Sequence, residues 1–209
     1  MLSFLLVGSV FVSCKSPSEP EAKAEVSSDP KVVALKMPEG FRADHLYSPG
    51  THDQGSWVAM TFDHKGRMIT SDQYGALYRI KLPPIGSEEK LKIESLQIKP
   101  ADAQDSLSRL PIGYAHGLLY AFNSLYVVVN NYDEEFPRHS GLYRLQDTNG
   151  DDQFDKVTLL KSLDGAGEHG PHSIILSPDK KSIYLIAGNH TDVPEMNAYR
   201  LPNSWQEDN

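Results

Sequence analysis

The sequence predicts an all-β protein built from a repeated unit of three or four strands. Short runs of Val, Ile, Leu and Tyr, separated by Gly, Pro, Asp and Asn, alternate in places with polar residues, and no 3.6-residue period is sustained. Two apolar strands around a tight polar turn, followed later by a strand with Tyr-Arg, occur three times. A recurring unit of this size is typical of a β-propeller blade.

The three copies of the unit begin at Trp57, His116 and His172. An apolar residue anchors the second strand of each copy, and these anchors lie 57 and 58 residues apart: Met68, Leu125 and Ile183. A solenoid or sandwich is disfavoured, because a sandwich does not require the same pattern to return. Propellers close with about four to eight blades. We therefore expect about three blades of an incomplete propeller over 31–209, in a fragment of a longer protein.

The first 14 residues predict a signal peptide. Their apolar run is too short to span a bilayer and ends at Cys14, the single cysteine of the chain. The residues before Cys14 resemble a bacterial lipobox, so we expect acylation of Cys14 and a periplasmic or cell-surface protein held to a membrane by a lipid anchor alone. A plain signal peptide is the alternative.

Residues 15–30 predict a disordered linker, because Ser, Pro, Glu, Ala and Lys leave almost nothing to bury. The 209-residue chain has a net charge of -8 and no cluster of Lys and Arg, which argues against nucleic acid as a partner. With Cys14 acylated, the folded part has no cysteine for a disulfide or a haem attachment.

The stretch "GAGEHG" at 165–170 matches the dinucleotide pattern GxGxxG, but the match is rejected. That loop must open a helix, whereas Pro171 and a strand-like run follow here. Zinc on His169 and His172 is also disfavoured: their spacing places two ligands on one face only in a helix, and catalytic zinc needs three protein ligands.

Alignment of the copies places Trp57, His116 and His172 at one equivalent position, just before the innermost strand of each blade. In a propeller these side chains converge at one face. Two imidazoles and an indole would form a titratable aromatic pocket that suits a small polar ligand or a planar cofactor. The alternative is that they only cap the channel.

The acidic stretch "DTNGDDQFD" predicts a structural calcium site. Its oxygen-bearing residues fall at positions 1, 3, 5, 7 and 9 of a calcium-loop template: Asp147, Asn149, Asp151, Gln153 and Asp155. The stretch is not an EF-hand, because Asp152 stands where the turn glycine belongs, Thr158 stands where a closing Glu belongs, and no helices flank it. A solvated hairpin tip is the alternative.

The segment "EHGPHSIILSPDKKSIYLIAGN" resembles the signature of the soluble quinoprotein glucose and sorbosone dehydrogenases, six-bladed propellers that bind pyrroloquinoline quinone (PQQ). The resemblance implies that His169 is the general base, which takes the proton of a sugar hydroxyl as hydride passes to the quinone. One departure is Ser173, where the family carries an arginine. The basic residues that hold the quinone in that family come from later blades.

A closer resemblance covers most of 37–209. The segments "GSWVAMTFDHKGRMITSDQYGALYRI", "GLLYAFNSLYVVVN" and "GEHGPHSIILSPD" resemble the amino-terminal propeller of secreted, membrane-bound dehydrogenase-like proteins of environmental bacteria, often followed by a cytochrome c domain. It implies quinone-dependent oxidation of a sugar, alcohol or aldehyde, with a cytochrome c as electron acceptor. The alternatives are a non-catalytic propeller that binds carbohydrate or protein at the same face, and a calcium-stabilised surface scaffold.

Overall fold

The computed structural model describes residues 28–193, which belong to two units divided between Leu46 and Tyr47. The described part of the first unit contains one helical turn, α1 (Pro30–Val33), which is capped by Asp29. Proline favours the first position of a helix because its ring presets φ and the missing N–H is not needed there. Residues 31–56 form no strand, so the strand-like part of the chain begins at Trp57 rather than at residue 31.

The second unit holds three antiparallel sheets, and the all-β prediction is confirmed. The first sheet contains β1 (Trp57–Phe62), β2 (Met68–Asp72), β3 (Leu77–Lys81) and β4 (Lys92–Leu96). The second contains β5 (Ala115–Ala121), β6 (Ser124–Val129), β7 (Gly141–Gln146) and β8 (Lys156–Ser162). The third pairs β9 (Pro171–Leu176) with β10 (Ile183–Ala187). The short helices of this unit are η1 (Pro49–His52) and α2 (Ser106–Arg109).

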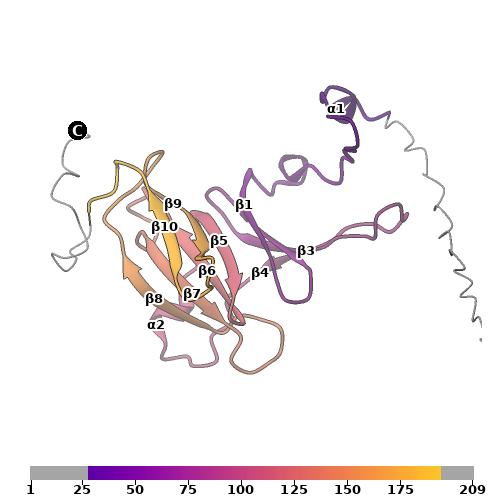
Figure 1. Ribbon diagram of the computed structural model, residues 1–209. Helices are drawn as coiled ribbons and strands as arrows, with labels where there is room; N and C mark the ends of the chain where they lie inside the picture. The colour runs from indigo at the N-terminus through magenta and orange to yellow at the C-terminus, as the bar shows by residue number, and fades with distance from the viewer. Residues whose placement is uncertain (1–27, 194–209) are drawn as a thin grey trace, which may run out of the picture. The chain divides into compact units, whose positions relative to one another are not determined.

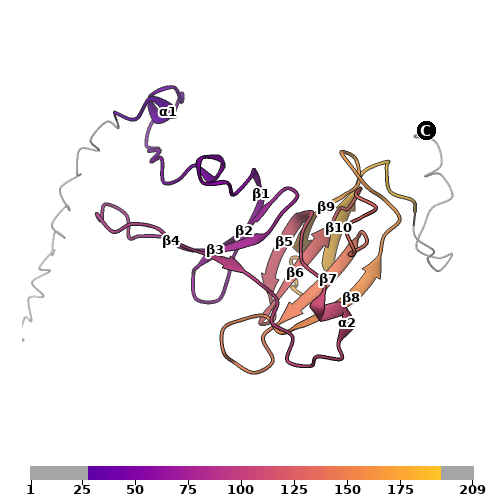
Figure 2. The ribbon, with the colours of Figure 1, turned by 180° about the vertical axis from the view of Figure 1, so that it is seen from behind.

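The second sheet lies between the other two (Figures 1 and 2). In every sheet each strand pairs with the strand that follows it in the chain. The first strand of the second sheet, β5, contacts both β1 and β9, so the first strands of the three sheets are neighbours in sequence order. No closed sheet is formed by the described strands.

Strand β6 is buried along its whole length because its two faces serve two different interfaces. Leu125 and Val127 belong to the apolar cluster that also contains Ile69 of the first sheet. Val128 belongs to a second cluster with Ile174 of the third sheet. This explains why the sequence of β6 is a continuous apolar run rather than an alternating one.

A bulge interrupts the pairing near the start of each first strand. In β1 the register shifts between Trp57 and Ala59, and in β5 it shifts between Ala115 and Gly117. In β9 the register shifts between Pro171 and Ser173, which pair with consecutive residues of β10. The residues left unpaired by these shifts are Val58, His116 and His172. A bulge at an equivalent place in every sheet re-aims one side chain per sheet.

Buried Arg138 fastens α2 to the second sheet. Its Nε donates to the backbone oxygen of Pro111 at 2.9 Å, and its Nη2 donates to those of Leu107 and Leu110 at 3.0 and 2.7 Å. The guanidinium also lies over the ring of Tyr143, with Cζ 4.9 Å from the ring centroid. Burial lowers the pKa of Arg138.

Replacement of Gly117 by alanine tests how closely β5 and β9 must approach. An added Cβ would overlap the backbone oxygen of His172 and lie 3.1 Å from Cγ2 of Val128. We expect Gly117→Ala to lower the free energy of unfolding by about 1–3 kcal/mol, the usual cost of overpacking. The control is Gly50→Ala, whose Cβ would meet only the Gly55 oxygen at 3.8 Å. Equal urea midpoints for the two variants would contradict the prediction.

Candidate functional site

A cleft of about 600 Å³ opens where the first strands of the three sheets begin. Each of the three bulge residues contributes to its wall. The remaining lining comes from loops that follow second strands or precede β9. The lining residues are Val58, Gln73, Tyr74, His116, Tyr132, Gly167, Glu168 and His172.

The surroundings of His116 in this cleft favour its neutral form. Its Nε2 lies 3.3 Å from the backbone oxygen of Gln73, and its Nδ1 lies 3.2 Å from Nδ2 of Asn130. A carbonyl oxygen only accepts, so the ring proton sits on Nε2, and Nδ1 accepts from the amide. Burial lowers the pKa of His116, and the neighbouring His172 lowers it further, although the hydrogen bond to Gln73 opposes the shift.

His172 packs edge to face against His116, with ring centroids 5.4 Å apart. Its Nδ1 lies 2.8 Å from the backbone oxygen of Gly170 and must donate to it. In the neutral ring this leaves Nε2 as the nitrogen with a free lone pair. A histidine oriented through one nitrogen and open at the other is the usual arrangement of a general base or of a hydrogen-bond acceptor for a ligand hydroxyl.

Tyrosines form the aromatic side of the cleft. Tyr74 and Tyr132 line it, and both contact Tyr114 edge to face, with centroids 5.9 and 5.3 Å from that ring. The side-chain hydrogen bond with Tyr74, followed by burial, raises the pKa of Tyr132 to about 12. Sequence reasoning missed both residues. The signal was present, because each follows the second strand of its copy, in "SDQYG" and "VNNYD".

The described lining offers no lysine or arginine to a polycarboxylate cofactor. Glu168 is its one acidic residue, and it includes no arginine or lysine. Carboxylate recognition in proteins relies on those cations, through bidentate or charge-assisted hydrogen bonds. The described lining alone therefore supplies no cation for the carboxylates of PQQ.

Two of the residues expected in the pocket lie elsewhere. Trp57 is not part of the cleft lining and packs between Tyr47 and Tyr78, with centroids 5.5 and 5.6 Å away. The bulge explains the difference: Val58, one residue later, occupies the position equivalent to His116 and His172.

His169 is exposed and is also not part of the cleft lining. Its Nδ1 lies 2.8 Å from Oδ1 of Asn189, and its ring stacks on His190 at 4.8 Å. Asn189 and His190 line a separate polar cleft of about 450 Å³. The structure therefore brings together His116 and His172, but not His169, around the larger cleft.

The acidic loop keeps its form through its own hydrogen bonds. Asp147 accepts from the backbone N–H of Gly150 and of Asp152, at 2.7 and 2.8 Å. The side-chain oxygens of Asn149 and Asp151 each accept from the backbone two residues later, at 2.9 Å.

The last expected ligand of the loop, Asp155, is buried. Its two carboxylate oxygens accept hydrogen bonds from the backbone N–H and the hydroxyl of Thr148, at 3.0 and 2.9 Å. Gln153 donates its backbone N–H to Asp151. Across residues 28–193 no group of three or more His, Cys, Asp or Glu side chains is placed to hold a metal ion. Calcium binding by this loop stays a prediction.

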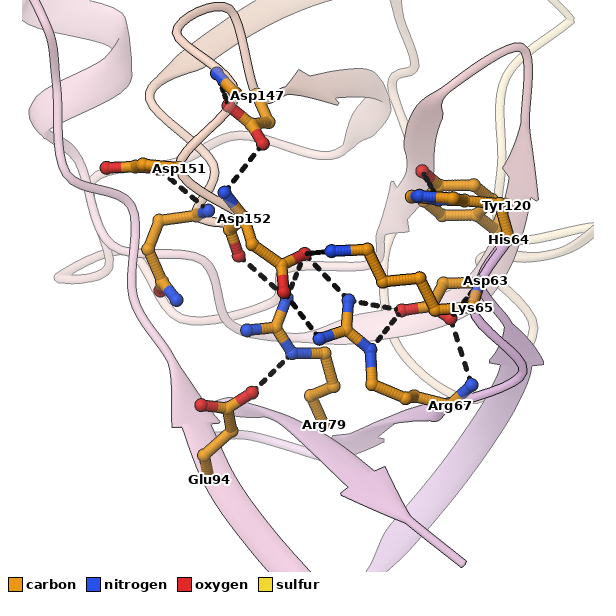
Figure 3. Close-up of polar contacts among 12 residues, drawn as sticks. Asp63, His64, Lys65, Arg67, Arg79, Glu94, Tyr120, Asp147, Asp151 and Asp152 are labelled. Carbon is orange, nitrogen blue, oxygen red and sulfur yellow. Dashed lines mark hydrogen bonds and ion pairs between the residues drawn. The ribbon is translucent and has the colours of Figure 1, made fainter.

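Asp152 joins the acidic loop to the first sheet (Figure 3). It has a left-handed backbone, with φ 69°, where the calcium template has glycine. Its carboxylate receives two hydrogen bonds from Arg67, at 2.6 and 2.7 Å, and pairs with Lys65 at 3.0 Å. Nη1 of Arg79 donates to the Asp152 backbone oxygen at 2.8 Å. Hydrogen bonding from Arg67 is the main reason that the pKa of Asp152 lies far below its ordinary value.

Comparisons with protein-family models, with curated proteins and with solved structures return no match for this chain. Neither family resemblance is therefore tested by these comparisons. The helices within residues 28–193 fall short of the length and apolarity that crossing a bilayer requires. Cys14, the signal peptide and most of the linker lie outside the described residues, so the lipid anchor stays a prediction.

Replacement of Asp152 by asparagine tests its ion pairs. We expect Asp152→Asn to lower the free energy of unfolding at pH 7 by about 1–3 kcal/mol, the usual range for hydrogen bonds to charged groups. Because the folded-state pKa is lowered, this stability is complete above the ordinary value of 3.8 and is lost as pH falls below it. The difference from wild type should therefore shrink in acid, as measured by urea unfolding at a series of pH values.

The matched control is Asp151→Asn, in the same loop. Asp151 accepts a hydrogen bond from the Gln153 backbone, which an asparagine oxygen can also accept, and it belongs to none of the ion pairs around Arg67. We expect a change below about 0.5 kcal/mol. Equal destabilisation by the two substitutions would show that loop charge, rather than the Arg67 pair, is responsible.

Proposed function

We propose that the cleft binds a small polyhydroxylated molecule of the carbohydrate class. The observation that carries this proposal is the edge-to-face pair of His116 and His172, set beside the aromatic side chains of Tyr74 and Tyr132. Aromatic faces pack against the C–H faces of a sugar ring, while imidazole and backbone groups pair with its hydroxyls. A site that combines a few convergent polar groups with aromatic walls is the usual form of a small-molecule pocket.

The proposal includes a β-propeller as the scaffold. Two features support it: the first strands of the sheets are neighbours in sequence order, and each sheet has its bulge at an equivalent place. Radial repetition of four-stranded antiparallel sheets is the propeller architecture. The cleft then lies at one end of the central channel, where one re-aimed residue per blade converges.

The charge of the cleft limits the kind of sugar. Glu168 is the one acidic residue of the described lining, the surroundings of His116 lower its pKa, and the described lining offers no arginine or lysine to balance an anion. Neutral sugars and amino sugars therefore suit the cleft better than uronic acids, whose carboxylate would face Glu168 without a cation.

Sugar binding can be measured by calorimetry with glucose, glucosamine and glucuronate. We expect binding of the first two and binding of glucuronate at least tenfold weaker. Tyr132→Ala should weaken glucose binding about twofold to tenfold, because a packed aromatic contact contributes about 0.5–1.5 kcal/mol. Phe122→Ala, a change at an exposed phenylalanine that does not line the cleft, is the control. A folded protein that binds none of these sugars would contradict the proposal.

A second candidate function is oxidation of the bound sugar, or of a related alcohol or aldehyde, with PQQ as oxidant and a cytochrome c as final acceptor. The geometry of His172 favours it: Nδ1 is fixed by Gly170, and Nε2 is free to take the proton of a ligand hydroxyl. The family resemblance implies that His169 has this role, whereas we propose His172, because its Nε2 is open to the cleft. The cations that would hold the quinone are not among the described lining residues.

The second candidate predicts PQQ binding and dye reduction with aldoses. His172→Ala should lower turnover at least a hundredfold, in line with the usual contribution of a general base, while His169→Ala should change it less than about threefold. Loss of turnover in His169→Ala alone would identify His169 as the general base. Sugar binding without any PQQ binding or turnover would leave a non-catalytic binding propeller.

A further inference from the structure

Within residues 28–193, the first and third sheets each leave one apolar face uncovered. On β1 the exposed side chains alternate, at Val58, Met60 and Phe62, and Met60 is 64% exposed. On the third sheet the exposed side chains are Ile175, Tyr184 and Ile186, and Tyr184 is 53% exposed. Single exposed apolar residues are ordinary, but contiguous sets such as these mark interaction surfaces. We call them the first-sheet face and the third-sheet face.

The third-sheet face repeats a face that is already an interface within the chain. When the sheets are aligned at their bulges, Ile175 matches Leu119, three residues after the bulge. Its pairing partner Tyr184 then matches Tyr126, the partner of Leu119. Tyr126 is only 7% exposed, because the third sheet covers it. The third-sheet face therefore corresponds to the face of the second sheet that packs against the third sheet.

The first-sheet face is the complementary half of the same interface. Met60 lies two residues after its bulge, as Leu118 and Ile174 do in β5 and β9. Leu118 is 7% exposed and packs in the cluster shared with the first sheet. Ile174 is 4% exposed and packs against the second sheet. In each case the preceding sheet covers this position, and only in the first sheet is it uncovered.

We infer that two copies of this chain associate head to tail, with the third-sheet face of one copy against the first-sheet face of the other. The interface continues the sheet-on-sheet packing that the chain uses twice internally. Each contact joins two different surfaces, and the two contacts of a closed pair are related by a two-fold axis. Two such contacts between two copies cover all four faces and close the assembly. The inference depends on the equivalence of the sheets and not on any ligand in the cleft.

The experiment is sedimentation velocity of the full chain over a range of concentrations. We expect a dimer for the wild type, and at least tenfold weaker association for Met60→Glu and for Tyr184→Glu, each of which places a charge on one face. Ile85→Glu is the control, because Ile85 is 98% exposed in the connection between β3 and β4. Circular dichroism and thermal unfolding check that each variant is folded. Phe62→Glu and Ile175→Glu serve as a second pair.

Mixing the variants distinguishes a head-to-tail contact from one between like surfaces. Met60→Glu keeps an intact third-sheet face, and Tyr184→Glu keeps an intact first-sheet face, so the mixture should form a one-to-one complex through one unaltered interface. A mixture that stays monomeric overturns the inference. So does a wild type that is monomeric at all concentrations, which would leave these faces to other parts of the chain or to another protein.

Discussion

The close packing of β5 on β9 at Gly117 is the constraint on which the candidate site depends. A glycine at this position lets the backbone oxygen of His172 approach β5 where any side chain would exclude it. The neighbouring bulge residue His116 therefore meets His172 edge to face. Because the two histidines come from different sheets, the geometry of the cleft is set by the distance between the sheets rather than by a loop within one of them.

The ion pairs of Asp152 also hold two sheets together, at a different place in the second unit. Arg67 begins the return from the β1–β2 turn, and Asp152 lies in the connection between β7 and β8, so their contact joins the first and second sheets. The apolar clusters fix the spacing of the sheets, while a bidentate pair also fixes their direction, because both guanidinium nitrogens must face the carboxylate. Apolar packing and charge pairing thus make separate contributions to the same interface.

The repeat in the sequence predicts the β-strands and, to within one residue, the start of each sheet, because apolar alternation and turn residues are local signals. The site was predicted only in part. A bulge shifts the pairing by one residue, and no local pattern marks it, so Trp57 was aligned where the structure places Val58. The role of Asp152 was missed for a different reason: its partner Arg67 is 85 residues away, and only the packed sheets bring them together.

The order of the strands also bears on how the chain is made. Each four-stranded sheet is formed from consecutive segments, 57–96 and 115–162, so its pairings are local and its strands need no partner from later in the chain. During synthesis the first sheet is complete before β5 has been translated. Ile69 and Leu77, which end in the core, are then uncovered until the second sheet arrives. During the interval between translation of the two sheets, the nascent chain therefore exposes apolar side chains that can aggregate.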